Sequence, residues 1–99
     1  MNNYSLIIEN AAQKDMLLIA DYIAIDNKKA ALQLVKTFYG KFSLLCSNPN
    51  IGTIRKDFTY KNVRFYVIKK RYLVVYTIVD NSLHILRVLS SYQDICSNL

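Results

Sequence analysis

The sequence is poor in the residues that interrupt or cross-link a chain, with one Pro, two Gly and two Cys among 99 residues. Collagen-like, linker-like and disordered chains are rich in Pro, Gly or charge, whereas this chain is 53% hydrophobic and 20% charged. Cys46 and Cys96 are too few for a disulfide framework, and their spacing matches no metal-ligand pattern. We therefore expect one globular domain over residues 1–99, with reduced thiols.

Targeting and catalytic motifs are also scarce. The N-terminus lacks a basic segment followed by an apolar one, and the most membrane-like run, residues 16–25, is short and contains Asp21. These absences predict a cytoplasmic protein that does not enter a membrane. His84 and Glu9 are the only His and Glu, and no HExxH, CxxC, GxSxG or P-loop pattern occurs. We therefore predict neither a metal nor a cofactor, and we interpret His84 as structural rather than as a general base.

Positive charge is concentrated in the second half of the chain. Residues 51–99 carry eight Lys and Arg against three Asp, whereas residues 1–50 carry five Lys against four acidic residues, within a net charge of +6. This asymmetry favours a polyanionic or acidic partner, because surface charge steers association and contacts phosphate. The alternative is that the charge serves solubility alone.

The first half of the sequence has the period of helices. Residues 4–8 predict a short strand, and Asn10 with Gln13 resembles a helix N-cap pair. Apolar residues at helical spacing then predict a first helix, whose face comprises Ala12, Met16, Ile19 and Ile23 and is widened by Leu18 and Tyr22. The second helix carries Ala31, Leu34, Val35, Phe38, Phe42 and Leu45, and it ends before Pro49. The short link at Asp26 and Asn27 makes the two an antiparallel hairpin, in which Gly40 could allow close approach.

After a turn at residues 49–52 the period becomes that of strands. Residues 63–69, 72–79 and 83–89 predict three strands joined by tight turns, which forces antiparallel pairing. An additional extended piece at residues 54–59 and a helical turn around residues 92–96 are also expected. The predicted fold class is α+β: an N-terminal strand, then a helical hairpin packed on one face of a mainly antiparallel sheet, in the order β-α-α-β-β-β.

Alternation along the strands suggests which residues face away from the helices. The all-apolar set Val63, Phe65 and Val67 is expected against the helices, which leaves Arg64 and Tyr66 on the open face. Tyr76 and Arg87 are expected beside them. Arg and Tyr together suit phosphate binding and base stacking, and they are also enriched in protein interfaces. The predicted target- or RNA-binding residues are Arg55, Lys56, Arg64, Tyr66, Lys69, Lys70, Arg71, Tyr76 and Arg87.

Several segments, in their order and spacing, resemble the RelE/ParE superfamily of toxins from type II toxin–antitoxin systems. Residues 12–23 resemble its "A..D...I..YI" helix, and Leu45, Pro49 and Gly52 its "L...P..G" turn. Residues 64–76 resemble its hairpin, and residues 86–94 its "i.RVlh..rD" ending. The resemblance implies a growth-inhibiting toxin, of the kind linked to plasmid stabilisation, that a cognate antitoxin neutralises.

Two branches of the superfamily give alternative functions. The RelE-like branch cleaves mRNA on the ribosome without metal, and it implies catalytic roles for Arg64, Arg87 and Tyr92. The ParE-like branch inhibits DNA gyrase by binding. Leu73 stands where RelE-like sequences often carry Arg, and Ser90 and Ser91 follow where His or basic residues are common. These departures favour the ParE-like branch, with the endoribonuclease as the alternative and an inactive partner-binding relative as a third interpretation.

Overall fold

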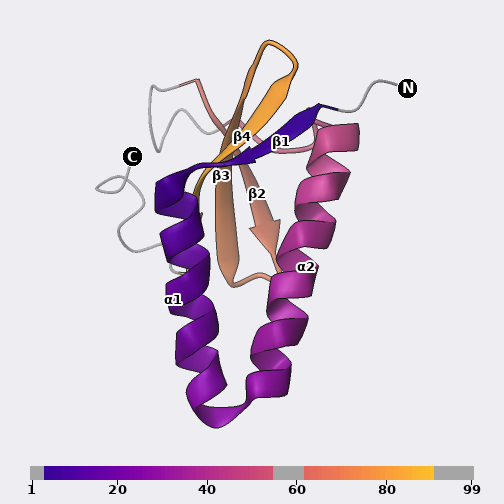
Figure 1. Ribbon diagram of the computed structural model, residues 1–99. Coiled ribbons are helices and arrows are strands. Elements are labelled where there is room, and N and C mark those ends of the chain that lie inside the picture. Colours follow the sequence, from indigo (N-terminus) through magenta and orange to yellow (C-terminus); the bar gives the residue numbers. More distant parts are fainter. Residues whose placement is uncertain (1–3, 55–61, 91–99) are drawn as a thin grey trace.

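The computed structural model describes residues 4–54 and 62–90, and Figure 1 shows the elements that this part of the chain forms. They are β1 (Ser5–Ile8), α1 (Asn10–Asp26), α2 (Lys28–Ser47), β2 (Arg64–Ile68), β3 (Tyr72–Val79) and β4 (Ser82–Leu89). The predicted order β-α-α-β-β-β is confirmed. The expected helical turn around residues 92–96 lies outside the described residues, as does the expected extended piece except for Ile54. Thr53 forms an isolated bridge with Phe65 just before that piece.

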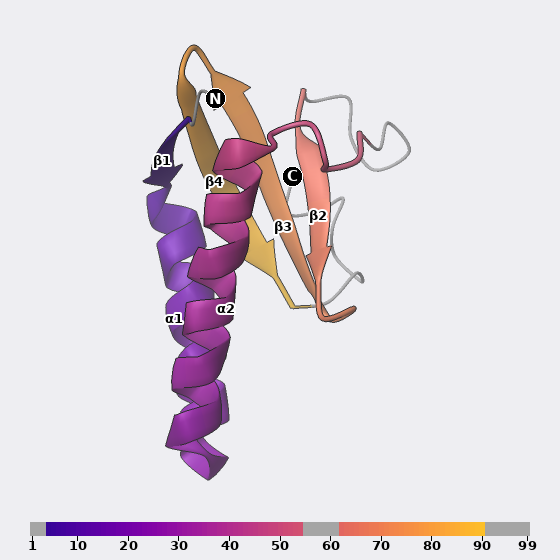
Figure 2. The ribbon, with the colours of Figure 1, turned by 90° about the vertical axis from the view of Figure 1, so that its right-hand side faces the viewer.

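The strands form one mixed sheet in the order β1-β4-β3-β2. β3 pairs antiparallel with both β2 and β4, whereas β1 pairs parallel with β4, so the sheet is mainly antiparallel as predicted. The helical hairpin covers one face of the sheet and extends beyond its lower end (Figure 2). A bulge in β4 opposite β3 pairs Val75 with Arg87 but Tyr76 with Ile85, which skips Leu86.

The ends of the helices follow from local hydrogen bonds. Asn27 caps α2, because its side chain accepts a hydrogen bond from the Ala30 amide at 3.0 Å. The predicted cap at Asn10 is wrong: Glu9 precedes α1, and Asn10 is the first helical residue. The Glu9 amide donates to the Ile85 carbonyl, and the Glu9 side chain makes no capping hydrogen bond, so the chain passes from the sheet into α1 without side-chain capping.

Both faces of the sheet are buried, and this reverses the predicted assignment of faces. The core between sheet and helices includes Ile68, Tyr72, Val74 and Tyr76, with Tyr66 packed against it. A second buried cluster lies on the far face and comprises Val63, Phe65, Leu73, Val75 and Leu89. Because apolar residues occupy both faces of β3, alternation separated the two sets but could not tell which one meets the helices.

Two further expectations about the hairpin are wrong. A Cβ built on Gly40 has no atom within 4 Å, so this glycine does not mediate close helix packing. Leu18 and Tyr22 do not extend the buried face of α1, because they are 69% and 78% exposed.

Within the described residues, no helix is long and apolar enough to cross a bilayer.

Candidate functional site

Tyr76 joins the middle of the sheet to the turn that follows α2. Its hydroxyl accepts a hydrogen bond from the Gly52 amide at 2.9 Å and donates one to the Pro49 carbonyl at 2.7 Å. The side chain is fully buried, and burial raises the pKa of the hydroxyl, against the opposing effects of the Gly52 hydrogen bond and the Arg64 charge. A Cβ on Gly52 would lie 2.6 Å from Cε1 of Tyr76, so only glycine admits the ring here. Tyr76 is thus a structural anchor, away from the open face where we expected it.

Arg64 holds the same turn from β2. Its Nη1 donates to the Gly52 carbonyl at 2.8 Å and lies 3.5 Å from the Asn50 carbonyl. Arg64 stands opposite Tyr76 in the sheet, so both side chains project to the side of the helices. Part of the hydrogen-bonding capacity of the guanidinium is therefore used in holding the turn. The predicted placement of Arg64 on the open face is wrong.

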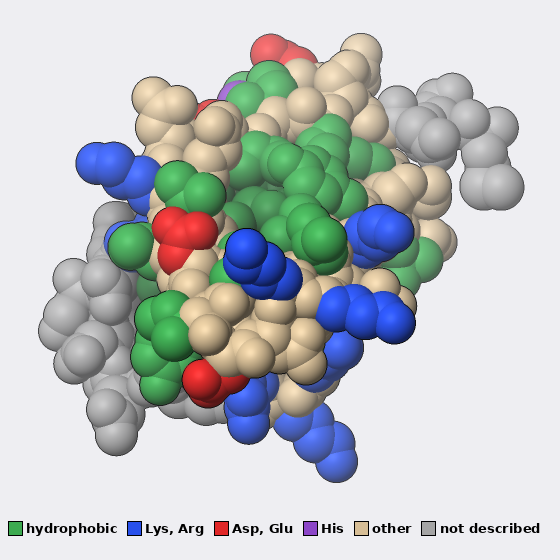
Figure 3. Space-filling view, turned by 60° about the horizontal axis from the view of Figure 1, so that its bottom comes forward, with side chains coloured by type: hydrophobic (Ala, Val, Ile, Leu, Met, Phe, Trp, Pro, Cys, Tyr) green, Lys and Arg blue, Asp and Glu red, His purple; other side chains and the backbone are tan. Residues whose placement is uncertain are grey.

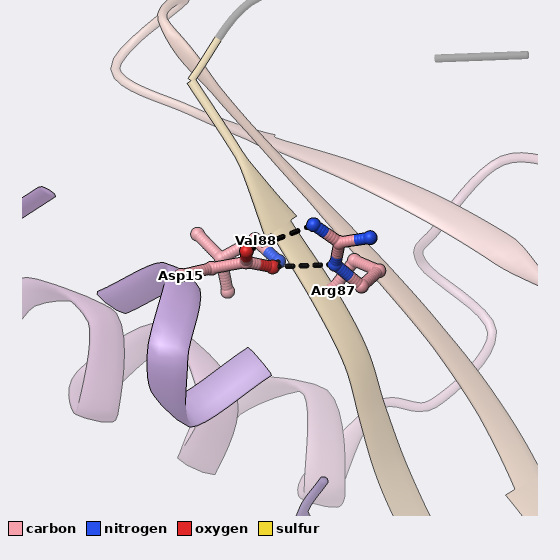
Figure 4. A network of polar contacts seen from close by, with 3 residues as sticks. All are labelled: Asp15, Arg87 and Val88. Carbon is pink, nitrogen blue, oxygen red and sulfur yellow. Dashed lines mark hydrogen bonds and ion pairs between the residues drawn. The ribbon is translucent and has the colours of Figure 1, made fainter. Parts of the chain in front are cut away.

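Arg87 forms an ion pair with Asp15 of α1 (Figure 4). The pair is bidentate, with Arg87 Nε 2.7 Å from Asp15 Oδ2 and Nη2 2.9 Å from Oδ1. The Val88 amide also donates to Asp15 Oδ2 at 2.9 Å. β1 ends opposite Ile85, so Asp15 satisfies a backbone donor on the uncovered part of β4. Hydrogen bonding to Asp15 raises the pKa of Arg87, and the pair fixes α1 against the sheet.

The structure does not bring Arg64 and Arg87 together. Arg64 lies on the edge strand β2 and bonds to the turn after α2, whereas Arg87 lies on β4, on the other side of β3, and pairs with Asp15. Tyr92, Arg55 and Lys56 lie outside the described residues. Within residues 4–54 and 62–90, no three His, Cys, Asp or Glu side chains gather in a way that could hold a metal ion.

A cationic turn, defined here as Lys69, Lys70 and Arg71, connects β2 with β3. All three residues are exposed, and Lys69 and Lys70 have φ of 55° and 57°. The Arg71 amide donates to the Ile68 carbonyl at 3.1 Å and closes the turn. The structure thus brings together three of the predicted target-binding residues at the lower end of the sheet in the view of Figure 2.

His84 lies on β4 and contacts the residue that precedes α1. Its Nδ1 lies 2.9 Å from Glu9 Oε2, which links β4 to the residue before α1.

An apolar groove runs along the outer side of the hairpin, away from the sheet. Its volume is about 810 Å³, and its lining includes Met16 and Leu17 of α1 with Val35 and Tyr39 of α2. Leu17 and Tyr39 are 62% and 50% exposed. Figure 3 shows hydrophobic side chains gathered on this side of the molecule with Lys and Arg around them. Such a patch is typical of a protein-docking surface.

Sequence reasoning missed both this groove and the role of Asp15. The apolar residues of α1 lie on several sides of the helix, and a helix of that kind is normally buried by a partner. That pattern was a readable signal for the groove. For Asp15 the only signal was a carboxylate within a run that is otherwise largely apolar, and its partner Arg87 is 72 residues away.

Comparisons with known proteins gave a family match and structural likenesses. The family model of the ParE toxin of the type II toxin–antitoxin system parDE matches residues 6–95. A chain of the chromosomal ParDE system of P. aeruginosa superimposes with a TM-score of 0.72 at 22% identity, covering 86% of this chain and 92% of that one. A conserved hypothetical protein of Helicobacter pylori gives a TM-score of 0.46 at 20% identity, with 88% and 93% covered. No curated protein sequence matches.

The family match spans most of the chain, and it includes the elements that carry Asp15, the Pro49–Gly52 turn, Tyr76 and Arg87. The P. aeruginosa likeness independently shows a common fold. The chain belongs to the ParE toxin family of type II toxin–antitoxin systems.

Proposed function

We propose that this toxin inhibits bacterial growth by binding DNA gyrase rather than by cutting RNA. The observation that carries the proposal is the engagement of the candidate catalytic cations in the fold. Arg87 is paired with Asp15 of α1, and Arg64 is bonded to the turn that follows α2. A nuclease needs free cations converging on one phosphate with a proton donor beside them. A protein that acts by binding has no such requirement.

The experiment is a pair of assays on the purified toxin. Gyrase supercoiling of a relaxed plasmid is followed beside a translation reaction in which mRNA 5′ ends are mapped. The proposal predicts inhibited supercoiling with intact mRNA. Cuts placed within codons, together with unaffected supercoiling, would establish the endoribonuclease instead. If neither occurs and expression alone does not stop growth, the chain is a partner-binding relative without toxicity.

We also propose that the cognate antitoxin neutralises the toxin by placing an amphipathic helix in the groove between α1 and α2. The groove is apolar at its centre, and Lys14 is part of its lining. The hairpin carries five Lys, whereas of its three Asp residues Asp15 is already paired with Arg87. An acidic flank on the incoming helix would complement that charge, whereas a second copy of the same lysine-rich surface would be repelled.

Substitution of the groove tests this docking. Leu17→Asp should weaken antitoxin binding by at least tenfold, because it places a charge in the apolar centre of the interface. Val67→Asp is the matched control, since Val67 is similarly apolar and 43% exposed but lies on the sheet. Equal losses in both variants, or none in either, would place the antitoxin elsewhere. Calorimetric titration with the co-purified antitoxin measures the difference.

A further inference from the structure

The cationic turn has a backbone conformation that its residues do not favour. Both Lys69 and Lys70 have positive φ, which is the pattern of the tight hairpin turn normally occupied by Asn-Gly or Asp-Gly. In the left-handed region the Cβ of an ordinary residue crowds the following carbonyl oxygen. A lysine has no short polar group to offset that crowding by a local hydrogen bond. Local structure therefore disfavours two lysines here.

The other hairpin of the same sheet provides an internal comparison. The turn between β3 and β4 contains Asp80 and Asn81, and Asp80 has φ of 55°. Asp and Asn are the non-glycine residues that best tolerate this conformation. The chain thus uses well-suited residues in one turn and unsuited cations in the other. The requirements of folding do not explain Lys69 and Lys70, which leaves their charge as the reason for their presence.

Within the described part of the chain, these lysine side chains form no ion pair, and Arg71 adds a third exposed cation next to them. Phosphate contacts need exposed positive charge on flexible stems and no apolar anchor. A protein interface would instead need large apolar residues at its centre, which the turn itself lacks.

We propose that the cationic turn contacts the phosphate backbone of double-stranded DNA. The choice of DNA rests on the proposed function, since gyrase acts on duplex DNA, and the contact would add to the toxin's hold on a gyrase–DNA complex. Binding of DNA by the toxin alone can be measured without gyrase, so the two proposals can fail separately.

The test is fluorescence anisotropy of a labelled 20-base-pair duplex of mixed sequence, titrated with toxin at several NaCl concentrations between 50 and 200 mM. The key variant is Lys69→Asn/Lys70→Gly, which places the residues favoured by this turn while removing two charges. We expect the slope of log K against log salt to fall in magnitude by about 1.8, at about 0.9 for each lost phosphate contact. We also expect the melting temperature to rise by a few degrees, so weaker binding cannot be attributed to unfolding.

Two matched variants complete the design. Lys36→Gln/Lys41→Gln removes two charges from α2 and should leave the slope as in the wild type. Lys69→Arg/Lys70→Arg keeps the charge and should retain binding. An unchanged slope in Lys69→Asn/Lys70→Gly, or an equal change in the α2 variant, would overturn the proposal. So would a lowered melting temperature, absence of wild-type binding at 50 mM NaCl, or tighter binding to a single-stranded RNA of equal charge. DNA binding without gyrase inhibition would refute the proposed target and leave this inference standing.

Discussion

Replacing Tyr76 by Phe removes one oxygen atom from the centre of the molecule and leaves the ring in place. In the wild-type protein the hydroxyl is both donor and acceptor, bonded to the Pro49 carbonyl at 2.7 Å and the Gly52 amide at 2.9 Å. The side chain is fully buried, so water cannot replace these bonds without a rearrangement of the turn. The substitution therefore tests whether the contact between sheet and turn stabilises the fold.

The expected loss can be worked out from these two bonds. The ring volume is kept, so the hydrophobic contribution changes little. Each neutral hydrogen bond contributes about 1 kcal/mol, and leaving the Gly52 amide without an acceptor adds a desolvation cost of similar size. We expect Tyr76→Phe to lower the free energy of unfolding by about 2–3 kcal/mol. In a domain of this length that corresponds to a fall of roughly 10–15 °C in melting temperature.

Urea unfolding followed by circular dichroism measures the difference. Tyr22→Phe is the matched control, because Tyr22 is 78% exposed and should change stability by less than about 0.5 kcal/mol. If both variants lose the same small amount, the hydrogen bonds of Tyr76 do not contribute as argued here, and the Pro49–Gly52 turn is held by other contacts.

Three other predictions follow from the same contacts. Gly52→Ala should destabilise the protein by about 2 kcal/mol or more because its Cβ would clash with Tyr76, whereas Gly40→Ala should stabilise it by about 0.5–1 kcal/mol in an open helical position. Thermal melts should therefore show a lowered melting temperature for the first variant and a raised one for the second, and changes of the same sign would contradict the packing. Asp15→Ala should lower the free energy of unfolding by about 2–3 kcal/mol, between the values for surface and buried pairs, since Asp15 is 13% and Arg87 28% exposed. Asp21→Ala, at an exposed position, is the control, and a double-mutant cycle with Arg87→Ala should show coupling between Asp15 and Arg87. Because burial raises the pKa of Tyr76, the contribution of its hydroxyl to stability is complete below about pH 10, the pKa of the unfolded state, and is lost as pH rises toward the folded-state pKa. Between pH 8 and 10.5, the free energy of unfolding should therefore fall less for Tyr76→Phe than for the wild type, and equal falls would refute this.

The helices, strands and their order were predictable because they depend on local patterns. Apolar residues at a spacing of three and four predicted the helical hairpin, and alternating apolar residues with tight turns predicted β2, β3 and β4. The resemblance to the RelE/ParE superfamily was carried by the same short segments, and it agrees with the family match over residues 6–95.

For the candidate site, the sequence indicated residue types but not where their side chains lie in the structure. Arg64, Tyr76 and Arg87 were predicted side by side on the open face, but their partners are Gly52, Pro49 and Asp15, which lie 12 to 72 residues away. The cationic turn was the exception. Lys69, Lys70 and Arg71 are consecutive in the chain, so their grouping was visible in the sequence.

What the sequence by itself determined is thus set by local patterns: element type, element order, the hairpin link and the clustered charge of one turn. Tertiary structure decided which sheet face meets the helices, since both faces are apolar and burial energy alone does not distinguish them. It also decided that the prominent Arg and Tyr residues hold the fold together, because their hydrogen-bond partners lie in the turn after α2 and on α1. Those outcomes depend on pairings between distant segments, and no local pattern of residues encodes them.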